Sequence, residues 1–316
     1  MKNGRKYKNL YPQAARGFKD ILVWQFGGGP VETPLIRPEE LPPFQVETCQ
    51  PGNLREPPPE KVQLTWIGHS TFLIQHRGRN ILTDPIFGNC QPIPSPNLRR
   101  MSPPGVTLES LPKIDDVLIS HCHYDHLDKP TIRRLGDQPH YWLPSGLSPW
   151  FLSQGIPRCR ELAWWQSASI GDGLELHSVP AQHFAARTPF DRDETHWCGY
   201  VLKSGRRSIY FAGDTGYCPT FREIGERFGG FDLAMIPIGA YRPRWIMKAI
   251  HVDPKEAVQI HVDVRSRRSV ACHWGTFRLT DEPPQEPPEV LRREMAERGL
   301  PPDEFRTLKF GETVVV

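Results

Sequence analysis

The sequence lacks the long hydrophobic runs that mark a membrane-spanning protein. No apolar stretch among its 316 residues approaches the roughly 18 residues that a transmembrane helix requires. The basic residues at the start of the chain, Met1 to Lys8, are not followed by a continuous apolar stretch and a small-residue cleavage site, so we expect no secretory signal. These absences favour a cytoplasmic protein whose contact with membranes, where it occurs, is peripheral.

The sequence also lacks paired cysteines and a strong net charge. Its seven cysteines are odd in number, scattered and without any CxxC pair, which disfavours both a disulfide framework and a thiolate zinc ribbon. We therefore expect reduced thiols. The formal net charge of +3 is too small to indicate nucleic acid as a partner, and we expect none.

Proline is abundant, and its distribution divides the chain. From Pro30 to Pro59 the sequence is proline-rich and weakly patterned. Residues 1–60 are therefore expected to form an extended arm that packs on or beside a main domain of residues 61–316. A second proline-rich stretch, Pro85 to Pro104, is long enough to be a lid or a binding loop. The hydrophobic content of 38% supports a packed interior in one main domain.

Short runs of apolar and β-branched residues predict the strands of the main domain. Runs at 62–67, 71–75 and 80–84, punctuated by Gly68 and Gly78, indicate an antiparallel opening. Later runs end abruptly before a polar side chain, as is typical of a buried strand that delivers a residue to a site. These runs are 116–120 before His121, 208–212 before Gly213 and Asp214, and 269–272 before His273.

Helical patterns alternate with these strands. They cover residues 220–228, 253–264 and 289–298, and the second begins with Asp253 at the N-cap and Glu256 as its capping-box partner. Alternating strands and helices predict an α/β fold.

The segment from His121 to Asp128, which is HCHYDHLD, has an unusual density of metal-binding side chains. It packs three histidines and two carboxylates into eight residues directly after a hydrophobic strand. A solvated histidine-rich turn is the alternative, but HxHxDH at a strand end favours a metal site. Imidazole and carboxylate ligands suit zinc, manganese or iron, and the sequence does not choose among these metals.

A site for two metals needs further ligands and a bridging carboxylate from other strand ends. His183, Asp214 and His273 are the candidates, because each follows a predicted strand or lies beside a glycine, where the backbone can come close to a cation. The predicted ligand set is His121, His123, Asp125, His126, His183, Asp214 and His273.

These motifs, in this order, resemble the metallo-β-lactamase superfamily. Within it, several further segments closely resemble the N-acylphosphatidylethanolamine-hydrolysing phospholipase D family, and the resemblance spans residues 60 to 312. The segments are TWIGHST at 65–71, LTDPIF at 82–87, FAGDTGYCP at 211–219, PIGAY at 237–241, PRW at 243–245 and HVDP at 251–254.

The resemblance implies a fold, a metal content and roles for the site residues. The fold is a four-layer αβ/βα sandwich with two divalent cations, expected to be Zn²⁺, at one edge of the facing sheets. A homodimer is also implied. The implied roles are one metal on His121, His123 and His183, a second on Asp125, His126 and His273, Asp214 bridging both, and substrate contacts from Tyr124 and His251.

The implied activity is that of a dinuclear zinc-dependent phosphodiesterase of phospholipase D type. A metal-bound hydroxide would hydrolyse N-acylphosphatidylethanolamine to N-acylethanolamine and phosphatidic acid, while Asp125 and Asp214 fix the metals and orient the attacking water. The expected partners are this phospholipid and a transient membrane surface. One alternative is the hydrolysis of a soluble phosphodiester, a lactone or another ester on the same fold. Another is a non-catalytic lipid-binding protein with structural metals, against which the complete ligand set counts.

Three residues near the motifs have two interpretations each. The phenol of Tyr124, between metal ligands, is expected to donate to a phosphoryl oxygen, or the ring is a packed aromatic. His251 lies just before a predicted helix start, where an anion is favoured, or it is a plain capping residue. His69 supports a ligand carboxylate or is a structural histidine.

Overall fold

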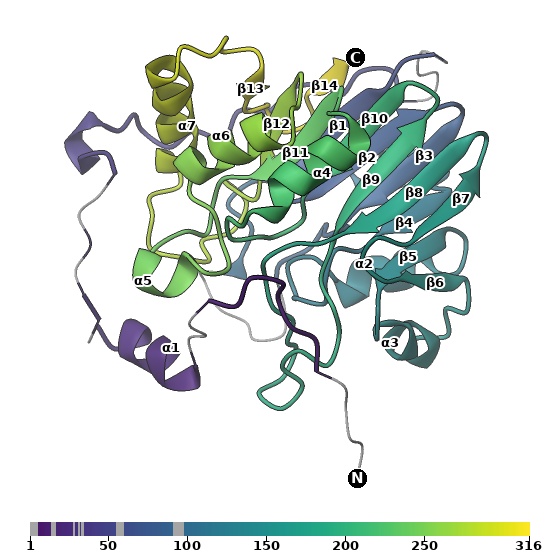
Figure 1. Cartoon of the computed structure of the whole chain (residues 1–316), viewed down its shortest axis with the longest axis horizontal. Helices are drawn as coiled ribbons and strands as arrows, with labels where there is room; N and C mark the ends of the chain where they lie inside the picture. The colour runs from purple at the N-terminus through teal and green to yellow at the C-terminus, as the bar shows by residue number, and fades with distance from the viewer. Residues whose placement is uncertain are drawn as a thin grey trace.

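Two facing β-sheets form the centre of the computed structural model (Figure 1), which describes residues 6–13, 17–27, 29–30, 32, 35–54, 60–90 and 98–316. Within these residues each sheet has seven strands. The first has the order β14-β1-β2-β3-β4-β5-β6, with β1 (Gln63–Gly68), β2 (Thr71–His76), β3 (Arg79–Thr83), β4 (Asp116–Leu118), β5 (His140–Pro144), β6 (Cys159–Leu162) and β14 (Thr313–Val315). The second has the order β13-β12-β11-β10-β9-β8-β7, with β7 (Ser167–Gly171), β8 (Leu174–Val179), β9 (Gly199–Ser204), β10 (Arg207–Phe211), β11 (Leu233–Pro237), β12 (Ser269–Cys272) and β13 (Phe305–Arg306).

Both sheets follow the same pairing pattern, antiparallel on one side and parallel on the other. β14, β1, β2 and β3 pair antiparallel, and β3 to β6 pair parallel. In the second sheet β7 to β10 pair antiparallel, and β10 to β13 pair parallel. Because parallel strands end at the same edge of a sheet, the loops after β3 and β4 leave one edge together, and so do the loops after β10 and β12.

Helices cover the two outer faces (Figure 1), and the covering helices of the first sheet are α2 (Lys129–Leu135) and α3 (Ser148–Ser153). The second sheet is covered by α4 (Thr220–Phe228), α6 (Pro254–Asp263) and α7 (Glu286–Glu297). The other helical segments within the described residues are α1 (Phe18–Gln25), α5 (Arg244–Met247), η1 (Pro38–Glu40) and η3 (Leu108–Ser110).

Alternation along the strands explains why the sheets pack on both faces. In β2, Phe72 and Ile74 belong to the core between the sheets, whereas Leu73 belongs to the core beneath α2 and α3. In β10, Phe211 lies between the sheets and Tyr210 faces α4 and α6. The result is the four-layer αβ/βα sandwich that the family resemblance implies.

The predicted elements are found close to their expected bounds. The helix at 220–228 coincides with α4, and α6 begins with the capping box of Asp253 and Glu256. Helix α7 begins at Glu286, three residues before the predicted start, because prolines are accommodated in a first helical turn, where no N–H partner is needed.

The arm of residues 1–60 is not wholly extended, because it contains α1. Tyr7 N donates to Asp193 O at 2.9 Å, and Cys49 N donates to Phe310 O at 3.0 Å, so the described parts of the arm contact the main domain. Of the expected lid at 85–104, residues 91–97 lie outside the described residues. All seven cysteines are among the described residues, and none of them forms a disulfide. In the described chain no helix is both long and apolar enough to cross a bilayer.

Candidate metal centre

Three histidines from two loops meet beyond the ends of β4 and β8. His121 Nε2 lies 2.8 Å from His123 Nδ1, and His183 Nε2 lies 3.2 Å from the same atom. His121 and His123 follow β4, because the chain turns immediately after its short buried run. The carbonyl of Ile250 faces His183 Nδ1 at 2.8 Å. A carbonyl only accepts, so Nδ1 carries the proton and Nε2 keeps a lone pair for the cluster.

A second cluster lies next to the first. Asp125 Oδ2 is 3.3 Å from His126 Nε2 and 3.3 Å from His273 Nε2. Asp125 and His126 come from the loop between β4 and α2, and His273 follows β12 of the other sheet. The two sheets therefore contribute to one cluster, which only the closure of the sandwich brings together.

Asp214 reaches both clusters. Its Oδ2 lies 3.1 Å from His126 Nε2 and 3.0 Å from His273 Nε2, and 4.0 Å from His121 Nε2 and 3.9 Å from His183 Nε2. Gly213 delivers it with φ of 61°, and a Cβ there would lie 2.8 Å from the side chain of Ser120. A single carboxylate between two sets of imidazoles is the arrangement of a bridging ligand.

The donor atoms fit a pair of divalent cations. His126 Nε2, His273 Nε2 and Asp214 Oδ1 are buried, and within the described residues they have no hydrogen-bond partner. His126 Nε2 and His273 Nε2 lie close to Asp214 Oδ2 without forming a hydrogen bond, as is expected of groups that converge on a common point. Leaving such groups unsatisfied costs about 1–3 kcal/mol each, which coordination would recover. A nitrogen and oxygen set without thiolate suits zinc, manganese or iron.

Burial keeps the first cluster neutral. It lowers the pKa of His123 to about 3 and that of His183 to about 4, and it holds the pKa of His121 well below its usual value. Neutral imidazole is the form that binds a metal. These three histidines are therefore ready ligands at neutral pH.

The second cluster carries opposite charges. Burial opposes the charged forms, but the nearby carboxylates, Asp214 first among them, raise the pKa of His126 well above its usual value and that of His273 to about 9. In turn, although burial acts to raise them, the pKa values of Asp125 and Asp214 are held well below the usual range, chiefly by His126. The imidazoles and carboxylates of this cluster thus stabilise one another when no metal is bound.

Asp84 supports the site and was not singled out as a site residue from the sequence. It is fully buried after β3, and its Oδ2 lies 2.7 Å from His126 Nδ1. Its two oxygens also accept from the backbone N of Ser120 at 2.7 Å and from its hydroxyl at 2.5 Å. Asp84 is the last residue of a predicted strand and His121 directly follows another, so the same strand-end signal could have found Asp84.

His69 contacts a ligand carboxylate, which was one of its two interpretations. Its Nε2 lies 2.9 Å from Asp125 Oδ2, and it lies in the turn between β1 and β2. The backbone also joins the two sides of the site, because His273 N donates to His69 O at 3.1 Å. A partner of this kind fixes the orientation of the ligand that it contacts.

Three non-glycine residues of the site have left-handed backbone. The φ angles are 53° at His69, 34° at Asp84 and 60° at His273. Such conformations cost about 1–3 kcal/mol each and persist where the surroundings enforce them, often at functional sites. The presence of three such residues in one site is a second indication, after the buried donor atoms without partners, that the site is functional.

The hydroxyl of Tyr124 donates to the protein backbone, whereas the sequence led us to expect that it donates to a phosphoryl oxygen. The phenol donates to Arg187 O at 2.9 Å, and the Arg187 guanidinium lies 3.9 Å from the centre of the ring. The same guanidinium donates to Cys122 O at 2.7 Å and to Leu127 O at 2.9 Å. Arg187 therefore holds both ends of the ligand loop, and no sequence signal indicated it.

His251 lies at the junction of the two clusters. Its Nδ1 is 3.9 Å from Asp214 Oδ2, and its ring centre is 5.0 Å from that of His183 and 5.4 Å from that of His273. Within the described residues this Nδ1 is buried without a hydrogen-bond partner. Burial lowers the pKa of His251 well below its usual value, so the ring is neutral beside the candidate metal ligands.

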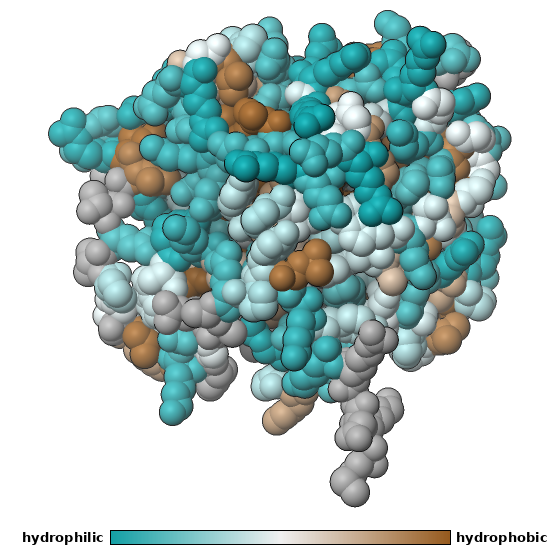
Figure 2. Space-filling view, viewed as in Figure 1, coloured by the Kyte–Doolittle hydropathy of each residue, from teal (hydrophilic) through white to brown (hydrophobic). Residues whose placement is uncertain are grey.

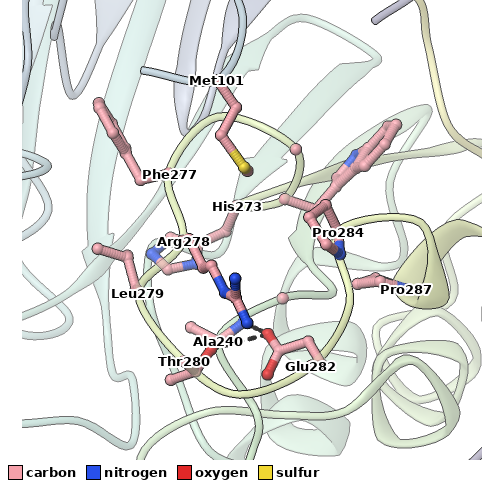
Figure 3. Close-up of a pocket in the computed structure, with 13 residues that line it drawn as sticks. Met101, Ala240, His273, Phe277, Arg278, Leu279, Thr280, Glu282, Pro284 and Pro287 are labelled. Carbon is pink, nitrogen blue, oxygen red and sulfur yellow. Dashed lines mark hydrogen bonds between the residues drawn. The ribbon is translucent and has the colours of Figure 1, made fainter. Parts of the chain in front are cut away.

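A pocket adjoins His273 (Figure 3), and Glu282 is part of its wall. The Glu282 carboxylate accepts from Ala240 N at 2.6 Å and from the hydroxyl of Thr280 at 2.8 Å. Gly239 packs so closely on His273 that a Cβ would lie 2.1 Å from the His273 carbonyl oxygen. The loop after β11 therefore braces the backbone of this ligand.

Comparison with known proteins agrees with the fold. Residues 79–274 match a family model described as a β-lactamase superfamily domain. Together, the sandwich and the ligand clusters define a metal-dependent hydrolase of the metallo-β-lactamase superfamily.

Relatives of higher sequence identity show which family within this superfamily the chain belongs to. A Caenorhabditis elegans protein named N-acyl-phosphatidylethanolamine-hydrolyzing phospholipase D 1 is 40% identical over 263 residues, which cover 78% of this chain and 74% of the relative. The mitochondrial Saccharomyces cerevisiae protein of the same name is 34% identical over 257 residues, 79% of this chain and 55% of the relative. An uncharacterized Mycobacterium tuberculosis protein is 41% identical over 239 residues, 73% of this chain and 63% of the relative. The chain belongs to the N-acylphosphatidylethanolamine-hydrolysing phospholipase D family.

Solved structures show the same fold at lower identity. The metallo hydrolase Igni18 from Ignicoccus hospitalis is 24% identical with a TM-score of 0.63, covering 81% of this chain and 98% of that one. An isothiocyanate hydrolase from Delia radicum gut bacteria is 22% identical with a TM-score of 0.66, covering 80% and 98%. These similarities concern the fold alone.

Proposed function

We propose that this chain hydrolyses N-acylphosphatidylethanolamine to N-acylethanolamine and phosphatidic acid. The observation that carries the proposal is the position of Asp214, whose Oδ2 lies within 4.0 Å of imidazole nitrogens from both clusters. This arrangement suits two cations on one phosphodiester. The names of the nematode and yeast relatives support the choice of lipid.

The ligands divide between two cations, for which we propose zinc. His121, His123 and His183 would hold one, Asp125, His126 and His273 the other, and Asp214 both. When bound, divalent cations lower the pKa of a coordinated water and stabilise charge that develops on phosphoryl oxygens.

The protein groups orient the reaction. Water attacks phosphorus and loses a proton, the P–O bond to the N-acylethanolamine breaks, and the departing oxygen ends with the proton that the water gave up. Asp125, held by His69 at 2.9 Å, and Asp214 fix the geometry around the attacking water. The neutral His251 ring, next to Asp214, is the proposed contact for a phosphoryl oxygen. Tyr124 would contact the substrate through its ring, because its hydroxyl already donates to Arg187 O.

A phospholipid substrate requires contact with a membrane surface, and exposed apolar side chains support this part of the proposal. Phe26, after α1, is 84% exposed, and Phe190, in the loop between β8 and β9, is 87% exposed. Figure 1 places α1 and this loop at the same lower end of the molecule, whereas the face in Figure 2 is mostly hydrophilic. Exposed Lys19 on α1 adds positive charge that favours an anionic bilayer.

The position of the cleaved bond tests the proposed reaction. The chain is incubated with N-acylphosphatidylethanolamine in mixed micelles made in ¹⁸O-labelled water, and a soluble bis-aryl phosphodiester is assayed in parallel. The proposal predicts unlabelled N-acylethanolamine and ¹⁸O in the phosphate of phosphatidic acid. Turnover of the soluble ester without any turnover of the lipid would overturn it in favour of a soluble substrate.

A further inference from the structure

The N-terminal segment 6–13 lies directly on the loop that presents His183. Its backbone is bound at two points, because Tyr7 N donates to Asp193 O at 2.9 Å and the Gln182 side chain donates to Tyr11 O at 2.7 Å. The ring of Tyr7 stacks on His196 at 4.4 Å between centres. This segment precedes the matched superfamily domain by about 65 residues in sequence, yet it contacts the backbone of a candidate ligand, His183.

Asn9 makes the closest contact between this segment and the site. Its side-chain amide donates to His183 O at 2.9 Å and accepts from His183 N at 3.1 Å. The same amide oxygen accepts from Trp197 Nε1 at 3.0 Å. One side chain therefore satisfies both backbone groups of a candidate ligand and ties them to Trp197, which is only 2% exposed.

The loop needs such a partner because it lies outside the sheet. β8 ends at Val179 and β9 begins at Gly199, so His183 has no strand ladder to satisfy its backbone. Backbone polar groups buried without a partner are costly. Ile250 O fixes the ring of His183 from one side at 2.8 Å, and Asn9 fixes its backbone from the other. Together, these contacts of Ile250 and Asn9 fix the direction in which His183 Nε2 points.

We propose that Asn9 is a positioning residue for His183 and thereby for the metal held by His121, His123 and His183. This inference rests on the metal content of the proposed function. An amide is required at this position because it presents an acceptor and a donor together; a carboxylate would face the carbonyl of His183 without a proton to donate.

The test measures metal affinity, separately from activity, in the full chain. Zn²⁺ affinity is determined by chelator competition, and the visible spectrum of the Co²⁺-substituted protein reports the coordination of each cation. Asn9→Ala is expected to lower the affinity for the metal held by His121, His123 and His183 by about 10–100-fold, the range typical for partners of metal ligands. The affinity for the other metal should not change. Asn9→Asp, which keeps only the acceptor, is expected to show the same selective loss.

Leu10→Ala is the matched control, because Leu10 belongs to the same segment and is 51% exposed. It should leave both affinities and the Co²⁺ spectrum unchanged. Thermal unfolding of the metal-stripped proteins measures the purely structural contribution, and Asn9→Asp keeps the test available if Asn9→Ala does not fold.

Wild-type affinity at both metals in the Asn9 variants, or an equal loss at both, would overturn the positioning role. Absence of metal from the wild-type chain would overturn this inference together with the metal part of the proposed function. A selective loss of one metal without lipid turnover by any protein would leave the role of Asn9 standing and refute only the proposed substrate.

Discussion

The candidate ligand histidines differ in the charge that they carry at neutral pH. His121, His123 and His183 have lowered pKa values and are neutral, whereas His126 and His273 have raised pKa values because carboxylates surround them. A metal entering the second cluster must therefore displace protons, and a metal entering the first need not.

This difference predicts a pH-dependent affinity at one metal. The pKa of His273 in the metal-stripped protein is about 9, so protons compete with the metal at pH 7 and compete less as the pH rises toward 9. Affinity at the second cluster should rise over this interval, while affinity at the first stays nearly constant. Titration calorimetry in buffers of different ionisation enthalpy measures the protons released. Metal binding without proton release at pH 7 would contradict the assignment.

Asp84 offers a second prediction at this scale. Asp84→Asn keeps the shape of the side chain but removes the charge 2.7 Å from His126 Nδ1. We expect metal affinity at the second cluster to fall by about 10–100-fold, with circular dichroism unchanged. Asp137→Asn, at an exposed position, is the control and should have no effect. Unchanged affinity in Asp84→Asn would remove Asp84 from the site.

All seven predicted ligands are brought together in the structure. The signals that predicted them are local, namely the dense HxHxDH segment, a buried apolar run that ends before a polar side chain, and a glycine beside the candidate residue. Asp84 carries the second of these signals but was not singled out, since it lacks the density of the HxHxDH segment. Arg187 and Asn9 could not be predicted this way. Their roles depend on contacts with distant backbone, such as Cys122 O and His183 O, which no local pattern records.

At the scale of elements, the start of α6 connects stability to the site. Asp253 accepts from Glu256 N at 2.9 Å and caps the helix two residues after His251. Asp253→Ala should lower the free energy of unfolding by about 0.5–2 kcal/mol, measured by chemical denaturation. Val262→Ala, on an exposed face of the same helix, is the control. An unchanged stability in Asp253→Ala would mean that the capping box contributes little here.

Helices with explicit end signals were predicted well, and short strands less precisely. α4 matches its predicted bounds, whereas β4 ends at Leu118, two residues before the predicted end of its run. The apolar run continues past the last ladder bond because Ile119 still packs under the first sheet. Helix α1 was not predicted, because residues 1–60 were interpreted as one extended arm on the strength of the prolines that follow this helix.

At the scale of the whole molecule, the proposed membrane contact predicts that substitutions can weaken membrane binding without changing the hydrolytic reaction. Phe26→Ser and Phe190→Ser should each weaken sedimentation with anionic vesicles by roughly tenfold, since burying a phenylalanine side chain is worth about 1.5–3 kcal/mol. Turnover of a soluble phosphodiester should not change. Val315→Ser, on β14 at the opposite end in Figure 1, is the control. Equal vesicle binding by all variants would place the contact elsewhere.

The sandwich itself followed from the family resemblance, because strand order depends on non-local pairing. The partnership of β14 with β1, for example, joins residues about 250 apart. Periodicity in the sequence indicated the α/β class and the delivery of ligands at strand ends, but only the folded chain shows that His273 from one sheet meets Asp125 from the other at 3.3 Å.

The central claim is that this chain is a metal-dependent hydrolase of a phospholipid. Elemental analysis of the purified chain, combined with an N-acylphosphatidylethanolamine assay before and after chelation, tests it most directly. We predict about two divalent cations per chain, N-acylethanolamine release that is lost on chelation, and recovery when Zn²⁺ is restored. Undiminished lipid hydrolysis by fully metal-free protein would contradict the claim.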